Sequence, residues 1–298
     1  MPIVYRPARE DDLATGDRLT VASINDLTER HAFGPMASPG PHPFQSFSLA
    51  DDPDGLWVAE DSGQMLGFAF SWVCGDLWFL AQLFISPNHQ NQGIGHTLIS
   101  RTMEQAQKRG ARTKALITFA FNRASQSLYI RHGIFPQLPV NFFAAPREGL
   151  RLPAGRVRSA PLSASSTHLR ELDAIDAVAL GVSRAKHHRY LLADAATKGL
   201  LFYAHNGDCI GYAYVIDGHV GPLAVTSQEA VVPALATALT FAVEAGAARV
   251  SAFIPSACRG ALSLAIASGM RITFPMLLMA DRDFGDWSRY MPRNPGFM

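Results

Sequence analysis

The chain has few of the features that mark a secreted, metal-binding or nucleic-acid-binding protein. Its three cysteines, Cys74, Cys209 and Cys258, are odd in number and widely spaced, which argues against a disulfide framework and indicates reduced core thiols. A formal net charge of +1, with no basic run and no aromatic platform, gives no case for nucleic acid as a partner. The pair His187 and His188 has no cysteine or carboxylate at metal-ligand spacing, so we expect no metal site and assign the pair to a surface helix.

Long apolar runs are also missing. Residues 230–243 form the longest nearly apolar helical run, but it is shorter than a bilayer span and lies between Glu229 and Glu244. The first ten residues contain no apolar segment of the kind that directs export. We therefore expect a cytoplasmic protein without membrane contact, and leave a homodimer open. A chain of 298 residues is long for one domain, which favours two.

What the chain does contain is a glycine-rich turn between a predicted strand and a predicted helix. An apolar segment ending at residue 85 precedes Gln90-x-x-Gly93-x-Gly95, and the apolar positions that follow have helical spacing up to Gly110. Glycines let backbone N–H groups approach a ligand, and a helix N-terminus favours an anion. The motif therefore predicts a diphosphate site, although ordinary strand-to-helix turns use the same glycines.

The elements after this turn narrow the choice of diphosphate site. A strand at residues 115–121 and a helix at residues 124–132 follow it. A nicotinamide-type dinucleotide fold would need G-x-G-x-x-G and an acidic residue after the next strand, and a P-loop would need a lysine where His96 stands. Neither pattern is present. Together with Asn122-x-x-Ser125-x-x-x-Tyr129, the turn resembles the cofactor motifs of the Gcn5-related N-acetyltransferase (GNAT) family.

The resemblance implies acetyl-CoA as co-substrate and a primary amine, on a small molecule or a peptide, as acceptor. Tyr129 would protonate the departing thiolate, unless it is only a buried helix tyrosine with a hydrogen bond. Asn122 would contact the pantetheine arm. The other implied coenzyme contacts are main-chain groups of Leu83 and Ile85, the motif residue Gln90, and the backbone N–H groups of Gln92, Gly93, Ile94, Gly95 and His96.

A base for the attacking amine, which is mostly protonated at neutral pH, cannot be assigned. Family members often carry Glu or His on the strand before the loop, but residues 79–82 are Phe, Leu, Ala and Gln. The nearest carboxylates, Asp76 and Glu60, are more typical of solvated hairpins, and a water chain stays open. The missing base leaves open how the attacking amine loses its proton, but acetyl transfer remains the expected reaction.

The chain also repeats itself. Gly110 and Gly133 recur as Gly246 and Gly269 at an offset of 136 residues, and the hairpin segment 63–70 recurs as 207–214 at an offset of 144. The second copy is therefore eight residues shorter where coenzyme A would bind. In that copy Glu229 stands for the first loop glycine, Val231 for the second and Ala265 for Tyr129, and a glutamate would repel a diphosphate.

We therefore predict an α/β (α+β) protein of two tandem GNAT-like domains, each a mixed, mostly antiparallel sheet flanked by helices. The domains would span residues 1–147 and 157–298, and the second would be degenerate. Tandem members share the form Asp173-x-x-Asp176 followed by Gly181-x-x-Arg184. A helix-end salt bridge between Asp173 and Arg184 is the simpler interpretation, and a ligand contact is the alternative.

Three other segments carry expectations. Residues 11–29 should form one or two helices, and the apolar, Pro/Gly/Ser-rich connection 31–54 should cover the acceptor side, which mildly disfavours a polyamine. The aromatic tail 281–298 should pack against another domain or subunit.

The leading hypothesis is an N-acetyltransferase with direct attack by the amine. A non-catalytic acyl-CoA or metabolite sensor is the alternative, and a scaffold is disfavoured because all the loop residues persist together.

Overall fold

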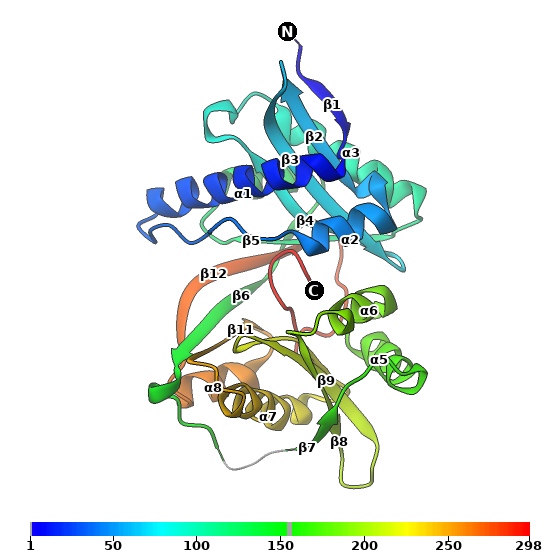
Figure 1. The fold of residues 1–298 in the computed structure, drawn as a ribbon, viewed down its shortest axis with the longest axis vertical. Helices are drawn as coiled ribbons and strands as arrows, with labels where there is room; N and C mark the ends of the chain where they lie inside the picture. The colour runs from blue at the N-terminus through cyan, green and yellow to red at the C-terminus, as the bar shows by residue number, and fades with distance from the viewer. Residues whose placement is uncertain (1, 154–156) are drawn as a thin grey trace. The chain divides into compact units, whose positions relative to one another are not determined.

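The computed structural model describes residues 2–153 and 157–298, and the chain forms two compact units (Figure 1). The first unit runs up to Phe135 and includes Met279–Arg282; the second comprises Pro136–Leu278 and Asp283–Met298. Strand β6 (Phe135–Pro146) is thus grouped with the second unit and the end of β12 (Arg271–Ala280) with the first. The boundary expected between residues 147 and 157 stays a prediction about where the two sequence copies join.

The first unit is built on a sheet whose strands follow one another in the chain. Each of the first three strands is antiparallel to the next, and the fifth is parallel to the fourth. Asp281 continues this unit, since its backbone N–H donates to Lys114 O at 3.0 Å. The strands are β1 (Val4–Pro7), β2 (Leu56–Asp61), β3 (Gln64–Cys74), β4 (Leu77–Ile85) and β5 (Thr113–Phe119).

Helices cover both faces of this sheet. Gly16 in α1 lies against Phe68 of β3, with 3.0 Å from a Cβ built on the glycine to the ring, while Gly67, the neighbouring β3 residue, lies against Leu98 of α3. Because successive strand residues point to opposite faces, α1 and α3 lie on opposite sides of β3. The helices are α1 (Glu10–Arg30), α2 (Pro43–Asp51), α3 (Ile94–Lys108) and α4 (Arg123–Arg131), with short 3₁₀ turns η1 (Pro53–Gly55) and η2 (Pro87–His89).

The segments before β2 are more helical than expected. Residues 10–30 form one continuous helix, whose first turn is acidic and whose N-terminus is capped by Asp12 accepting the Arg9 N–H at 2.8 Å. The connection after it contains helix α2, which Pro43 starts at its first position. Proline there removes no hydrogen bond, so a Pro-rich segment can still begin a helix.

The second unit repeats the arrangement of two antiparallel strand pairs, helix, strand and helix. Its strands lie in the order β6-β11-β10-β9-β8-β7, all antiparallel except β10 with β11, and the short β13 pairs with β10. Its strands are β7 (Arg158–Pro161), β8 (Lys198–Tyr203), β9 (Cys209–Ile216), β10 (His219–Val225), β11 (Arg249–Pro255) and β13 (Tyr290–Met291). Its helices are α5 (Ser166–Ala179), α6 (Ala185–Ala193), α7 (Val231–Glu244) and α8 (Arg259–Ala267), with 3₁₀ turns η3 (Arg147–Gly149) and η4 (Gln228–Ala230).

The predicted fold class is confirmed: mostly antiparallel strands are flanked by helices throughout the described residues. No helix in residues 2–153 or 157–298 is both long and apolar enough to cross a membrane. Helix α7, the most apolar run noted in the sequence, is instead buried within the second unit, where Leu235 and Leu239 are fully inaccessible.

Candidate functional site

The predicted coenzyme strand, β4, loses its neighbour halfway along. Relative to β3 it contains one extra residue, Ala81, which makes a β-bulge. Its parallel pairing with β5 ends at Leu80 and Leu116, whereas β4 itself continues to Ile85. Beyond the bulge, the β5-facing edge of residues 81–85, which includes Leu83, therefore has no strand partner in the described chain.

The loop after β4 presents backbone donors at the start of α3. Asn91 and Gly93 both have left-handed backbone conformations, with φ of 63° and 81°. Gly93 caps the helix, and the first intrahelical bond runs from the Thr97 N–H to Gly93 O at 3.1 Å. The N–H groups of residues 94–96 therefore have no partner within the helix, and the first turn holds no acidic residue. Such a helix start attracts an anion.

Three elements that carry predicted site residues meet beside Gly95. A Cβ on this glycine would lie 3.2 Å from Leu128 Cδ2 and 3.8 Å from Ile85 Cγ1. The end of β4, the start of α3 and helix α4 therefore lie in close contact here, and a larger side chain at position 95 would require Leu128 to shift. Gln90 reaches back to the strand, its Nε2 lying 3.5 Å from Ile85 O.

The Asn122–Tyr129 motif forms helix α4. The Asn122 side chain caps the helix by accepting the Ser125 N–H at 3.1 Å, and its amide nitrogen has no hydrogen bond to the residues described. Tyr129 is buried; burial raises its pKa to about 12, against a smaller lowering by a hydrogen bond with the Ser125 side chain. Tyr129 therefore keeps its proton at neutral pH, as a proton donor must.

The two carboxylates near the site in sequence are already paired. Glu60 Oε2 lies 2.8 Å from Arg6, and Asp76 Oδ2 lies 2.6 Å from Arg112. Gln82, which follows the bulge, accepts a long hydrogen bond of 3.4 Å from Gln45. Both carboxylates are thus held in ion pairs, in agreement with the hairpin assignment.

A histidine pair beside the loop was not expected from the sequence. His132 Nε2 lies 3.0 Å from His96 Nδ1, which joins the end of α4 to the start of α3. Burial lowers the pKa of His132, and the neighbouring His96 and Arg131 add to that effect. Because the two residues are 36 positions apart, no local pattern connects them.

In the second unit the corresponding positions are occupied by the chain itself. Strand β10 pairs with the parallel β11 only at His219 and Val220. Past a bulge, Leu223 and Ala224 pair instead with the two residues of β13. The edge of β10 that corresponds to the unpaired edge of β4 is thus covered by β13, which belongs to the C-terminal tail.

The start of α7 also differs from that of α3, because a side chain of the protein lies where the first unit has none. It follows the 3₁₀ turn Gln228–Ala230, and Ala230 has an ordinary right-handed conformation. Hydrogen bonds with its own backbone and with the Ser227 side chain lower the pKa of Glu229, so this helix start carries a carboxylate of its own. A cleft of about 310 Å³ beside it is lined by Gln228, Val231, Ala257, Arg259, Gly260 and Ser288.

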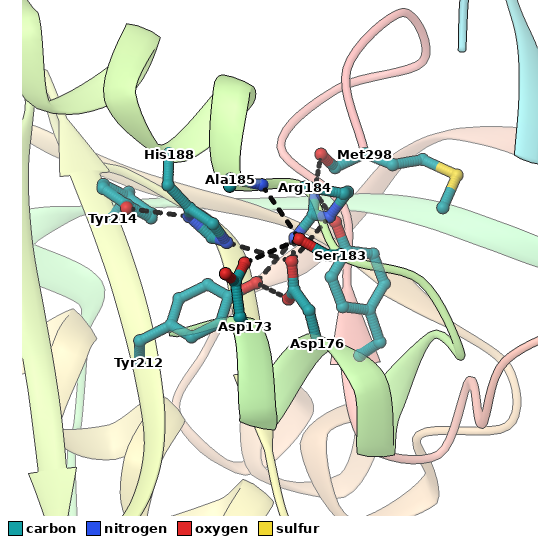
Figure 2. Close-up of polar contacts among 10 residues, drawn as sticks. Asp173, Asp176, Ser183, Arg184, Ala185, His188, Tyr212, Tyr214 and Met298 are labelled. Carbon is teal, nitrogen blue, oxygen red and sulfur yellow. Dashed lines mark hydrogen bonds and ion pairs between the residues drawn. The ribbon is translucent and has the colours of Figure 1, made fainter. Parts of the chain in front are cut away.

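Asp176, Arg184 and His188 of the second unit form a buried network (Figure 2). Arg184 makes two hydrogen bonds with Asp176, at 3.0 and 3.1 Å, and His188 Nε2 lies 2.9 Å from the same carboxylate. Burial alone would raise the pKa of Asp176, but the charge of Arg184 and the hydrogen bond from His188 lower it to about 2. The expected Asp173–Arg184 bridge is wrong: Asp173 accepts a hydrogen bond from Ser183 at 2.7 Å.

Further contacts of this network tie the tail to the unit. Arg184 also donates to Tyr212 OH at 2.6 Å, to Tyr290 OH at 2.9 Å and to the backbone oxygen of Met298. His187 and His188 are both buried, so their assignment to a surface helix is wrong. The tail aromatics are buried too and pack within the second unit, where Phe297 lies 4.9 Å from the His187 ring. Their partners are residues far away in sequence, which no local pattern reveals.

Comparison with known proteins places the first unit in a family. Residues 22–134 match the model of the Acetyltransferase (GNAT) family. An uncharacterized N-acetyltransferase of Bacillus subtilis, YhfO, is 30% identical over 100 residues, which cover 32% of this chain and 67% of that protein. A longer relative from Methanocaldococcus jannaschii, also named an uncharacterized N-acetyltransferase, is 30% identical over 89 residues, 28% of this chain and only 39% of that protein.

Solved structures resemble the whole chain. A Pyrococcus horikoshii protein described as a candidate acetyltransferase has a TM-score of 0.77 at 17% identity, covering 99% of this chain and 96% of that one. A tandem GNAT protein from the clavulanic acid biosynthesis pathway has a TM-score of 0.59 at 15% identity, covering 94% and 98%. At such identities the likeness concerns the fold. The family match and the YhfO relative lead to one conclusion: this chain belongs to the GNAT family of acetyltransferases.

Proposed function

We propose that the first unit transfers the acetyl group of acetyl-CoA to a primary amine. One observation carries the proposal. The start of α3, whose backbone N–H groups have no partner within the helix, follows the edge of β4 that has no strand partner in the described chain. The diphosphate would bind the N–H groups of residues 92–96. The pantetheine arm would run along Leu83 and Ile85, with Asn122 beside it.

The chemistry would be direct attack. The lone pair of the neutral amine forms a C–N bond with the thioester carbonyl carbon, and the C–S bond breaks. Tyr129 gives its proton to the thiolate and recovers one from the nitrogen, which must lose a proton to become an amide. The acceptor would be a small molecule or a peptide. Cys74 and Cys258 form no disulfide with the described residues, which fits a reducing compartment, and we place the reaction in the cytoplasm.

A charge substitution in the loop tests the site. Gly93→Glu places an anion where the diphosphate would bind and should abolish acetyl-CoA binding measured by titration calorimetry. Any side chain at φ of 81° is strained, so Gly93→Asn is the control: asparagine tolerates this conformation and adds no charge. The proposal predicts that Gly93→Asn retains most of the affinity. Equal affinity of Gly93→Glu and the native protein would show that the loop is not the site.

The sensor alternative keeps the same binding site without turnover. It is favoured by one observation: both carboxylates near the site are held in ion pairs, so neither is free to act as a base. A thiol-release screen with amino acids, aminoglycosides, polyamines and peptides separates the two hypotheses. Release of coenzyme A with any amine supports the transferase, whereas binding without release across the screen supports the sensor.

A further inference from the structure

Four aromatic rings gather where α1 and β5 end. The rings of His31 and Phe33 each lie 4.8 Å from that of Phe121, centroid to centroid, and Phe119 lies 5.0 Å from it. Phe33 is 41% exposed and the other three are half-buried. The ring cluster, defined as these four residues, is therefore an uncharged surface within reach of solvent, made by two segments far apart in sequence.

The cluster lies on the segments that flank the open strand edge. Ser23 Oγ in α1 donates to Ile85 O at 3.1 Å, so the helix passes the end of β4 before it reaches His31. On the other side, Phe121 immediately precedes Asn122, the cap of the helix that carries Tyr129. The ring cluster is thus joined, through α1 and through Asn122, to two of the elements that form the candidate coenzyme site, β4 and α4.

His31 is held in one orientation by its backbone. Its Nδ1 lies 2.9 Å from Leu27 O, and because a carbonyl oxygen only accepts, Nδ1 must carry the proton. In the neutral imidazole, Nε2 then has the free lone pair. Nε2 makes no hydrogen bond with residues 2–153 or 157–298. An imidazole arranged in this way can accept a proton, whereas Glu60 and Asp76 are both held in ion pairs.

We propose that the ring cluster receives the acceptor, an amine on an apolar or aromatic skeleton, and that His31 removes the proton from its ammonium group. This inference rests on the proposed function. The ammonium N–H bond breaks, its proton goes to Nε2, and the freed lone pair forms the C–N bond; the imidazolium later returns the proton to water. Because none of the four rings carries a carboxylate, the further charges of a polyamine would find no partner in the cluster.

The first test removes the imidazole. His31→Ala should lower kcat/KM by a factor of about 10² to 10⁴ while leaving acetyl-CoA affinity unchanged, and added imidazole should restore part of the rate. His31→Gln, which keeps the bulk of the side chain, should be equally slow. The control is His205→Gln, an exposed histidine of the second unit, which should remain active. Full activity of either His31 variant, or no rescue by imidazole, would overturn the role of His31.

The second test concerns the acceptor. Among probe amines, phenethylamine should be acetylated at least tenfold more efficiently than spermidine, and Phe33→Ala should raise the KM for phenethylamine without changing acetyl-CoA affinity. A preference for spermidine, or an unchanged KM in Phe33→Ala, would overturn the acceptor assignment. These failures differ from failure of the proposed function, in which the native protein would acetylate no amine at all.

Discussion

Strands β4 and β10 occupy corresponding places in the two units, but they differ in whether their edge has a partner. In each, the second strand of a hairpin bulges and parts from its parallel neighbour: β4 after Leu80, and β10 after Val220. Among the described residues, the edge of β4 beyond Leu80 has no strand partner, whereas Met291 and Tyr290 pair with that of β10. Backbone N–H and C=O groups in such an edge need partners. The comparison teaches that the chain itself can complete a bulged, separated strand, as β13 does for β10, and we propose that coenzyme A completes β4.

The helix that follows shows the same contrast. Helix α3 begins at a left-handed glycine with no acid in its first turn, while the start of α7 is preceded by Glu229. A carboxylate at a helix start satisfies the dipole that a phosphate would otherwise satisfy. Strand and helix therefore agree: the second unit supplies from its own residues both groups that the first unit would take from coenzyme A.

The largest expected effect comes from breaking the buried network of the second unit. Asp176→Asn leaves the buried Arg184 without its counter-charge and should lower the free energy of unfolding by about 3–5 kcal/mol, measured by urea denaturation. Asp173→Asn, which affects one exposed hydrogen bond, should change it by less than about 0.5 kcal/mol. Similar values for the two variants would contradict a structural role for the network.

Removing the Tyr129 hydroxyl tests whether the first unit uses its open site for chemistry. Tyr129→Phe should reduce kcat by a factor of about 10² to 10⁴ with acetyl-CoA affinity nearly unchanged, because one proton donor is lost and little buried area. The measurement is steady-state kinetics with an acceptor for which chemistry limits the rate. An unaltered kcat would make Tyr129 a structural residue.

Weakening β13, the strand that pairs with β10, should lower the stability of the second unit alone. Met291 is fully buried beside Leu223, so Met291→Ala should cost about 2–5 kcal/mol of stability. Ile266→Ala, at a side chain that is 59% exposed, is the control and should change stability by less than about 0.5 kcal/mol. If Met291→Ala is as harmless as the control, β13 does not complete the sheet.

Acid should weaken the second unit through the same network, with a smaller effect. The pKa of Asp176 is about 2 in the folded protein, against 3.8 as the ordinary value. The stabilisation from its ionised form is therefore complete above about pH 4 and is lost as the pH falls toward 2, by roughly 2 kcal/mol. Denaturation curves at pH 5 and pH 2.5 measure the loss. An equal loss in Asp176→Asn would assign the acid sensitivity to other groups.

The glycine loop and its neighbouring elements were predictable because local chemistry encodes them. Gly93 is needed where the backbone turns left-handed, and the helix after it has a clear apolar period. The hairpin repeats were readable for the same reason. The fold class followed from these segments, and the structure confirms it.

The sequence did not reveal contacts between residues that are far apart in the chain. Arg184 meets Tyr290 across 106 residues, and His31 meets Phe121 only after both have folded onto neighbouring elements. Helix α2 was missed because its prolines suggest a loop, although Pro43 lies at a helix start where proline is tolerated. Residues that act through tertiary contacts carry no periodic signal, so sequence patterns miss them.

The central claim is that coenzyme A binds the first unit and not the second, and amide hydrogen exchange of the full chain tests it most directly. Acetyl-CoA should slow exchange at the backbone amides of residues 92–96 and along residues 81–85, where the free protein offers donors without partners. The amides of residues 223–231 should be unchanged. Slowed exchange at residues 223–231, or none at residues 92–96, would contradict the account.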